Sequence, residues 1–315
     1  MNEPLVDILM SVYNGEKFLV DQLESLLSQT HKNWRLVVRD DKSTDSSVRV
    51  LCEYRSRYPE KIIFASDQRG RLGACQGFAQ AVHHSSADYM MFCDQDDVWL
   101  PTKVESSLAE ILRLERLHPG MPIVVYTDLI VVDEELKVIA ESFWRYQQID
   151  PQDNSLSTLI LDNVATGCTM IMNRPLKELA APVPSEAVIH DWWFTLVCSV
   201  YGKVSYLSDR TVLYRQHGRN EIGAQDYRLS IRIRRVCKSP QGFYSRTTKM
   251  AGLARAQARA LLTHIEGKAV PASTLLTPLR RYVASTSTVE RKWCLIRYKM
   301  LSGHYIRASK KLFFC

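Results

Sequence analysis

The chain has 315 residues, of which 46% are hydrophobic and 24% are charged, so it contains enough apolar material for a sizeable core. No apolar run reaches the roughly 18 residues that a membrane-spanning helix needs, and the first residues lack the pattern of a secretory signal. We therefore expect a cytosolic protein. Its eight cysteines have no CxxC spacing, which argues for reduced thiols and against a zinc site.

The charge is distributed unevenly along the chain. Residues 227–315 contain 19 Lys and Arg and only two acids, Glu266 and Glu290, a formal charge of +17 that leaves −10 for residues 1–226. Such an imbalance predicts a basic segment that meets an anionic partner. We therefore divide the chain into a catalytic domain, residues 1–226, and a basic helical extension, residues 227–315.

The N-terminal part alternates between strands and helices. Buried strands are predicted at residues 5–12, 34–38, 61–65 and 89–93, and apolar residues at helical spacing predict helices at 17–28, 47–58 and 77–84. This alternation predicts an α/β, Rossmann-like fold with a mostly parallel sheet flanked by helices.

Further elements follow Pro101. We predict a helix to about residue 117, strands at 123–133, 138–140, 204–207 and 212–215, a glycine-containing segment at 163–172 that ends in a strand, and a helix at 190–200. The C-terminal third is predicted to be helical, with breaks at Pro240, Pro271 and Pro278.

Three polar clusters directly follow predicted strands: residues 11–14, residues 40–41 and residues 94–97. Ligands of open parallel sheets bind outside the carboxyl ends of the strands, so we expect the three clusters to meet at one rim. Asp94 and Asp96 can share Mg²⁺ or Mn²⁺, which also binds phosphate oxygens. The alternative is a solvated acidic loop, but the position after a buried strand and before Trp99 favours the metal site.

Asp40 and Asp41 end the second predicted strand. A carboxylate at this rim can accept the N3–H of a uracil or thymine ring. The alternative is a pair of residues that caps the next helix.

Asp191 stands at the start of a predicted helix, beside His190, Trp192 and Trp193. An Asp at a helix N-terminus stays ionised and can act as a general base for an acceptor hydroxyl, and indole faces suit a sugar. On spacing alone, the alternative of an N-cap Asp with core tryptophans is favoured. His217, after the last predicted strand, could bind the metal or the diphosphate, or be structural.

Together these residues resemble the inverting glycosyltransferases of family two with the GT-A fold, and among them the bacterial O-antigen and capsule rhamnosyltransferases. The resemblance covers roughly residues 6–223. Residues 10–19 resemble the opening loop, 40–45 the "DDxSxD" motif, 71–78 the "NLG…NF" pattern, 93–99 the metal motif, 190–193 the base motif, and 214–217 with Gly223 the closing motif. Arg71 and Gly77 depart from the pattern, because asparagine is usual at both positions.

The resemblance implies roles for individual residues. Nucleotide-binding residues are expected at Ser11, Tyr13, Asp40, Asp41, Gly73 and Asp94, metal ligands at Asp94, Asp96 and His217, and the general base at Asp191. Trp99, Trp192 and Trp193 are expected to contact the donor or acceptor sugar. The resemblance also implies a nucleotide-sugar donor, expected to be dTDP-L-rhamnose, and a lipid-linked saccharide acceptor in cell-surface polysaccharide biosynthesis.

Four alternatives remain open at this point. The first is a UDP-hexose-using glycosyltransferase of the same fold, and the second is a nucleotidyltransferase, for which residues 11–17 form a poor phosphate loop. The third is a nucleic-acid-binding protein, suggested by the basic tail, and the fourth is a sugar-binding module without catalysis.

The basic extension contains one amphipathic segment. Its apolar face consists of Val289, Trp293, Ile296 and Met300, and its flanking cations are Arg291, Lys292, Arg297 and Lys299. Such a helix can lie in a membrane interface against anionic lipid, although an apolar stripe more commonly packs on its own protein. Because no groove-reading motif accompanies the charge, we expect the inner face of the cell membrane as the partner and no nucleic acid.

Overall fold

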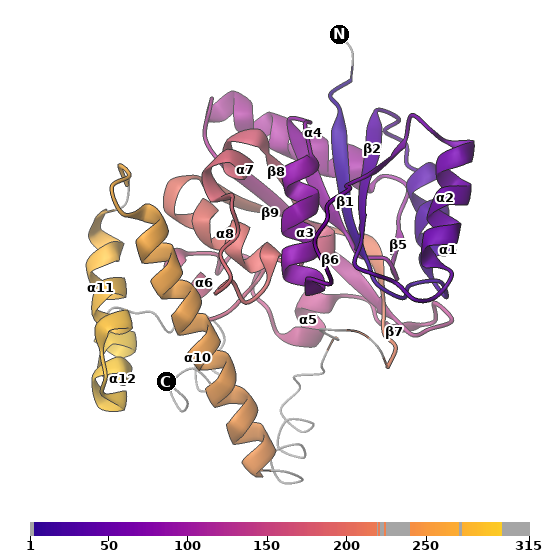
Figure 1. The fold of residues 1–315 in the computed structure, drawn as a ribbon. Helices are drawn as coiled ribbons and strands as arrows, with labels where there is room; N and C mark the ends of the chain where they lie inside the picture. The colour runs from indigo at the N-terminus through magenta and orange to yellow at the C-terminus, as the bar shows by residue number, and fades with distance from the viewer. Residues whose placement is uncertain (1–2, 219, 221–223, 225–239, 271–272, 298–315) are drawn as a thin grey trace.

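The computed structural model describes residues 3–218, 220, 224, 240–270 and 273–297 (Figure 1). The proposed domain boundary at residue 226 lies outside these residues, as do Gly223, Pro271, Lys299 and Met300. Within the described part of the chain, no helix is long and apolar enough to cross a membrane.

One mixed sheet forms the centre of the molecule, and the part that the structure describes has nine strands. Their order is β3-β2-β1-β4-β8-β6-β9-β5, and β7 pairs with β6 at the side. The strands are β1 (Val6–Val12), β2 (Trp34–Asp40), β3 (Ile62–Phe64), β4 (Tyr89–Cys93), β5 (Val98–Trp99), β6 (Ile123–Val132), β7 (Val138–Ala140), β8 (Ile171–Asn173) and β9 (Lys203–Arg215).

The first four strands are parallel to one another, as their alternation with helices predicts. β8 joins this half antiparallel to both β4 and β6, whereas β6 and β9 are parallel. The carboxyl ends of β1, β2 and β4 therefore lie along one edge, which brings the three polar clusters together. The predicted α/β, GT-A-like architecture with a mostly parallel sheet is confirmed.

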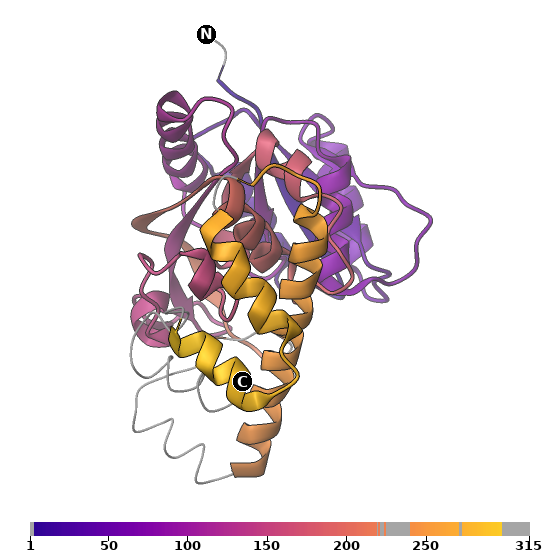
Figure 2. The ribbon, with the colours of Figure 1, turned by 90° about the vertical axis from the view of Figure 1, so that its left-hand side faces the viewer.

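Helices cover both faces of the sheet (Figures 1 and 2). They are α1 (Leu19–Leu27), α2 (Ser47–Arg57), α3 (Gly73–His84), α4 (Lys103–Leu117), α5 (Phe143–Gln147), α6 (Leu156–Leu159), α7 (Arg174–Ala180), α8 (His190–Tyr201), α10 (Pro240–Ile265), α11 (Ser273–Ala284) and α12 (Thr288–Arg297), with a 3₁₀ turn at Gly167–Thr169. The short helices α5, α6 and α7 were not predicted, because one or two turns give too little periodicity to recognise.

Alternate residues of each central strand enter two separate cores. Ile8 and Met10 of β1 pack with α1, α2 and α4, whereas Leu9 faces α3 and α8. Strands buried on both faces read as continuous apolar runs, which is why their positions could be predicted.

The C-terminal helices pack on the same side of the sheet as α8 (Figure 1). Ala258 and Leu261 of α10, Leu279 of α11 and Leu295 of α12 are buried in the core that contains Leu9. Basic composition alone did not predict this packing.

Two sequence predictions need correction. Pro278 lies inside α11 and does not break it. Because proline has no backbone N–H, one hydrogen bond is missing in the second turn of the helix, and the burial of Leu279 and Tyr282 holds the helix in place. The two short strands predicted at 204–207 and 212–215 are one strand, β9, which continues past register shifts opposite Asp128.

Candidate active site

A cavity of about 1470 Å³ lies at the carboxyl ends of the central strands. Nine of the twelve predicted site residues line it: Ser11, Tyr13, Asp41, Gly73, Asp94, Asp96, Asp191, Trp192 and His217. Asp40, Trp99 and Trp193 do not line it. A cavity of this size exceeds what one drug-sized ligand needs and suits a large, extended one.

Asp41 forms one wall of the cavity and is almost fully buried. Its Oδ1 accepts hydrogen bonds from Arg39 and from the backbone N–H of Leu72 (2.7 Å), and its Oδ2 accepts one from the N–H of Gly73 (2.8 Å). Three donors hold this carboxylate in one orientation, and Oδ2 keeps a lone pair for a further donor. Asp40 instead accepts from the N–H groups of Lys42 and Ser43, so it stabilises its own turn.

Tyr13 and Arg71 line the same cavity as Asp41. The Arg71 guanidinium stands over the Tyr13 ring, 3.7 Å from its centroid. A guanidinium on an aromatic face is a cation–π pair, and both residues line the cavity. Arg71 therefore gives this wall a flat, positively charged rim.

Gly77, the other departure from the family pattern, makes room for Ser11. A Cβ at position 77 would lie 2.2 Å from Ser11 Oγ. An asparagine at position 77 would displace the Ser11 side chain, so the Ser11 conformation requires a glycine at position 77.

Asp94 and Asp96 present their carboxylates to the cavity from the turn between β4 and β5. His217 Nε2 lies 2.7 Å from Asp96 Oδ2, and the His217 ring packs on Phe18 with centroids 4.8 Å apart. Arg215 fixes this corner, because its Nε donates to the Asp96 carbonyl and its backbone N–H donates to Asp97 Oδ1. Asp96 and His217, 121 positions apart in the sequence, thus meet at the predicted metal site.

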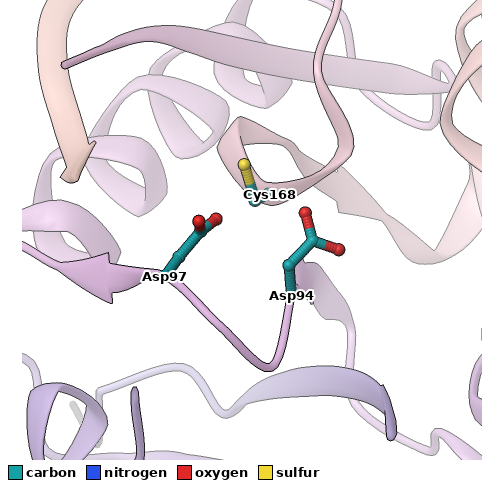
Figure 3. Close-up of side chains that lie close together, drawn as sticks. All are labelled: Asp94, Asp97 and Cys168. Carbon is teal, nitrogen blue, oxygen red and sulfur yellow. The ribbon is translucent and has the colours of Figure 1, made fainter. Parts of the chain in front are cut away.

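Asp97 belongs to a second group of potential ligands, with Asp94 and Cys168 (Figure 3). Their ligand atoms lie within 4.8 Å of one another. Asp97 is fully buried, and burial and the nearby charges of Asp96 and Asp94 raise its pKa well above the usual value. Burial also raises the pKa of the Cys168 thiol. Asp94 and Asp97 offer carboxylate oxygens, which Mg²⁺ and Mn²⁺ prefer, whereas the Cys168 thiol is a soft ligand, so Asp97 joins Asp94 and Asp96 as a candidate ligand.

Asp191 lies at the start of α8 and lines the same cavity as Asp41. Its Oδ1 accepts from Asn163 Nδ2 (3.1 Å) and from the N–H of Trp192 (2.5 Å), and its Oδ2 accepts from the N–H of Gly167 (2.7 Å). Burial raises the pKa of Asp191 to about 7, against the opposing effect of these three donors. A carboxyl group with this pKa is half ionised at neutral pH, as a general base requires.

The tryptophans depart from their predicted role. Trp193 is fully buried, its Nε1 donates to the Ala180 carbonyl, and its ring contacts His264 of α10. Trp99 is buried beneath Lys103, whose ammonium lies 4.6 Å from the ring centroid. Only Trp192 reaches the cavity wall, and it donates to the Leu159 carbonyl. The alternative of core tryptophans therefore applies to Trp193, and Trp99 is likewise a core residue, because sequence position does not reveal which side of a helix or turn faces the core.

The sequence did not single out Asn163, Gly167 or Gln95, although all three line the cavity. Asn163 and Gly167 donate to Asp191, and Gln95 bonds to the backbone of Tyr13. For Asn163 and Gly167 the only sequence signal was a glycine-containing segment before a strand, which indicates a turn and no chemistry, whereas Gln95 lay inside the polar cluster 94–97 without a role of its own.

The fold and cavity define an α/β protein with an acidic ligand site at the strand ends. The chain matches the family described as Glycosyl transferase family 2 over residues 7–179. That match covers more than half of the chain, so this protein belongs to glycosyl transferase family 2.

Two relatives illustrate this membership. EpsE of Bacillus subtilis, named as a glycosyltransferase, is 34% identical over 132 residues, which are 42% of this chain and 45% of EpsE. The matched region thus spans less than half of EpsE. The dTDP-rhamnosyl transferase RfbG of Shigella flexneri is 23% identical, over 68% of this chain and 74% of RfbG.

Solved structures share the fold. TarS of S. aureus in complex with UDP-GlcNAc superposes with a TM-score of 0.53 at 16% identity, over 98% of this chain and 90% of that one. The mannosyltransferase PcManGT of Pyrobaculum calidifontis, in complex with GDP-Man and Mn²⁺, gives a TM-score of 0.50 at 16% identity, over 99% and 88%.

Proposed function

We propose that this protein is an inverting glycosyltransferase that moves one sugar from a nucleoside-diphosphate donor to a saccharide hydroxyl. The observation that carries the proposal is Asp191, a buried carboxylate with a pKa of about 7 on the wall of a cavity that also contains Asp41, Asp94 and Asp96. Family membership supports the same reaction.

In the proposed reaction, Asp191 accepts the proton of the acceptor hydroxyl while the hydroxyl oxygen bonds to the anomeric carbon. The bond from that carbon to the phosphate oxygen breaks on the opposite face, and the nucleoside diphosphate leaves with both electrons. One displacement of this kind inverts the anomeric centre. Asn163 and Gly167 keep the carboxylate pointing in one direction throughout.

Asp94 and Asp96 line the cavity, His217 contacts Asp96, and these residues offer two carboxylates and one imidazole to a divalent cation. Mg²⁺ or Mn²⁺ bound there would offset the negative charge of the diphosphate. The Mn²⁺ named with PcManGT supports this cofactor.

For the donor we propose a pyrimidine nucleotide, and dTDP-L-rhamnose in particular. The free lone pair of Asp41 Oδ2 suits the N3–H of uracil or thymine, and Tyr13, with the Arg71 guanidinium over its ring, lines the same cavity. The name of RfbG supports rhamnose, whereas UDP-GlcNAc in TarS favours the alternative of a UDP-hexose. A nucleotidyltransferase remains the second alternative.

For the acceptor we propose a lipid-linked saccharide at the inner face of the cell membrane, in cell-surface polysaccharide biosynthesis. Three residues of α12, which we name the α12 apolar face (Val289, Trp293 and Ile296), are 78%, 46% and 60% exposed. The opposite side of α12 packs on the protein through Cys294 and Leu295. The exposure of these three residues in the described part of the chain argues against the alternative that they pack on the catalytic domain. The cations Arg281 and Arg297 lie nearby and suit anionic lipid.

The test is hydrolysis of a panel of nucleotide sugars, with and without Mg²⁺ or Mn²⁺, by the wild type and by Asp191→Asn. We expect donor-specific, metal-dependent release of a nucleoside diphosphate, and a loss in kcat of about a hundredfold or more in the variant with donor binding retained. Asp209→Asn, at an exposed site on β9 outside the cavity, is the matched control. Near-normal turnover by Asp191→Asn would overturn the assignment of the base, and release of pyrophosphate would favour a nucleotidyltransferase.

A further inference from the structure

Gln95 makes a two-point contact with the backbone of a residue 82 positions away. Its Oε1 accepts a hydrogen bond from the N–H of Tyr13 (2.8 Å), and its Nε2 donates to the carbonyl of the same residue (3.1 Å). A side-chain amide that bonds to both groups of one residue mimics a neighbouring strand. The neighbour is missing here, because the pairing of β1 with β4 ends at Met10 and Cys93.

Gly15 provides the space for this contact. A Cβ at position 15 would lie 2.6 Å from Gln95 Oε1 and 2.7 Å from its Cδ, and the nearest neighbours of that Cβ all belong to Gln95. Gly15 is thus required by the close approach of the Gln95 amide, and not by a left-handed backbone.

The other side of the same loop is fixed to the loop after β2. Gly15 donates its N–H to Ser47 Oγ (2.8 Å), and Asn14 donates its N–H to Ser43 Oγ (3.0 Å). Residues 13–15 therefore bond on one side to the segment that follows Asp41 and on the other side to the turn that contains Asp94 and Asp96. Gln95 makes the hydrogen bonds on the side of that turn.

We propose that Gln95 is a positioning residue, which holds the Tyr13 surface at a fixed separation from the metal-binding turn. This inference rests on the proposed function, in which Tyr13 contacts the base and Asp94 and Asp96 hold the cation beside the diphosphate. Both ends of a nucleoside diphosphate then meet a preorganised site, and less ordering is needed on binding. Gln95 acts through Tyr13 and does not touch the bond that breaks.

The test is a double-mutant cycle on the full chain: wild type, Gly15→Ala, Gln95→Ala and the double variant. Calorimetry with UDP and with dTDP, in the presence of Mg²⁺, gives the dissociation constants. We expect Gln95→Ala to weaken binding about tenfold, because two hydrogen bonds that order the loop are lost. Its kcat for donor hydrolysis should change much less than its KM.

Gly15→Ala alone should weaken binding at least as much, since the methyl group displaces the Gln95 amide. In the Gln95→Ala background, the three side-chain atoms that the methyl group would meet first are absent, so its further cost should be less than about twofold. A merely structural role for either residue would give independent effects. Gln76→Ala, which removes a glutamine that bonds to the Pro184 carbonyl outside the cavity, should leave nucleotide affinity unchanged.

Wild-type affinity in Gln95→Ala, or an equal cost of Gly15→Ala in both backgrounds, would overturn the positioning role while the proposed function stands. Thermal unfolding of each variant shows whether the fold is lost. If Gln95→Ala does not fold, Gln95→Glu takes its place in the cycle, because the glutamate retains an acceptor for the Tyr13 N–H but loses the donor to the Tyr13 carbonyl. An intermediate affinity for that variant supports the proposal, and wild-type affinity contradicts it. If the wild type bound neither nucleotide, the proposed function would fail together with the inference.

Discussion

Replacing Asn163 by alanine removes one of the three donors that stabilise the ionised form of Asp191. Hydrogen bonds to the charged form lower a pKa, so their loss raises it. A hydrogen bond to a charged group contributes about 1.5–3 kcal/mol, but water can replace part of it in an open cavity, so we expect a shift of about one pKa unit.

The expected result is a displaced acid limb in the pH–rate profile. From a wild-type pKa of about 7, the midpoint should move to about 8. At pH 7 the ionised fraction then falls from about one half to about one tenth, so the rate falls about fivefold, and at pH 9 the two proteins should nearly converge. Alkaline pH should therefore rescue Asn163→Ala.

The assay is single-turnover hydrolysis of the donor between pH 5.5 and 9.5, which isolates chemistry from product release. The control is Asn154→Ala, because Asn154 donates to the Pro151 carbonyl and has no contact with Asp191. A uniform loss of rate at every pH, with the wild-type midpoint, would refute the reasoning and reduce Asn163 to a structural residue.

Three further predictions follow from the same geometry. Asp191→Asn should stabilise the fold by about 4 kcal/mol at pH 8 but not at pH 4 in urea denaturation. Burial raises the pKa of the folded state from 3.8 to about 7, so the wild type bears the cost of about 1.4 kcal/mol per pKa unit only once Asp191 is ionised in the folded state too; equal stability at pH 8 would contradict it. Asp96→Ala should abolish the Mn²⁺ dependence of donor affinity without unfolding, and unchanged calorimetry with Mn²⁺ would count against the metal site. Serine at all three positions of the α12 apolar face should abolish co-sedimentation with anionic vesicles, whereas Leu117→Ser, at an equally exposed site on α4, should not; binding to neutral and anionic vesicles alike would exclude the charge-dependent docking.

The central sheet could be predicted because its strands carry the strongest sequence signal. β4 begins and ends at the predicted residues, Tyr89 and Cys93, and its polar continuation lies at the rim where the topology requires it. Asp94, Asp96 and Asp191 were identified for the same reason: each is a carboxylate directly after a strand or at the start of a helix, where charge is tolerated.

The supporting residues could not be predicted, because their roles depend on contacts between distant segments. Asn163 is 28 residues from Asp191, and Gln95 is 82 residues from Tyr13. An amide side chain has no fixed chemistry of its own, so only its neighbours reveal what it holds in place. The same applies to Trp193, whose indole could face either a sugar or the core until α7 and α10 are seen to enclose it.

The packing of α10 also changes how the C-terminal extension should be understood. Gln257 Oε1 accepts the N–H of Val188, three residues before Asp191, and His264 bonds to the Leu179 carbonyl and contacts Trp193. The extension thus supports the segment that positions Asp191, the proposed base, in addition to presenting the α12 apolar face. Removing it would expose side chains that α10 now covers, such as Trp193, and a loss of membrane binding in such a truncation would not distinguish docking from unfolding. Substitutions confined to exposed positions of α12 avoid this ambiguity, because they change the surface and leave the contacts of α10 with α8 intact.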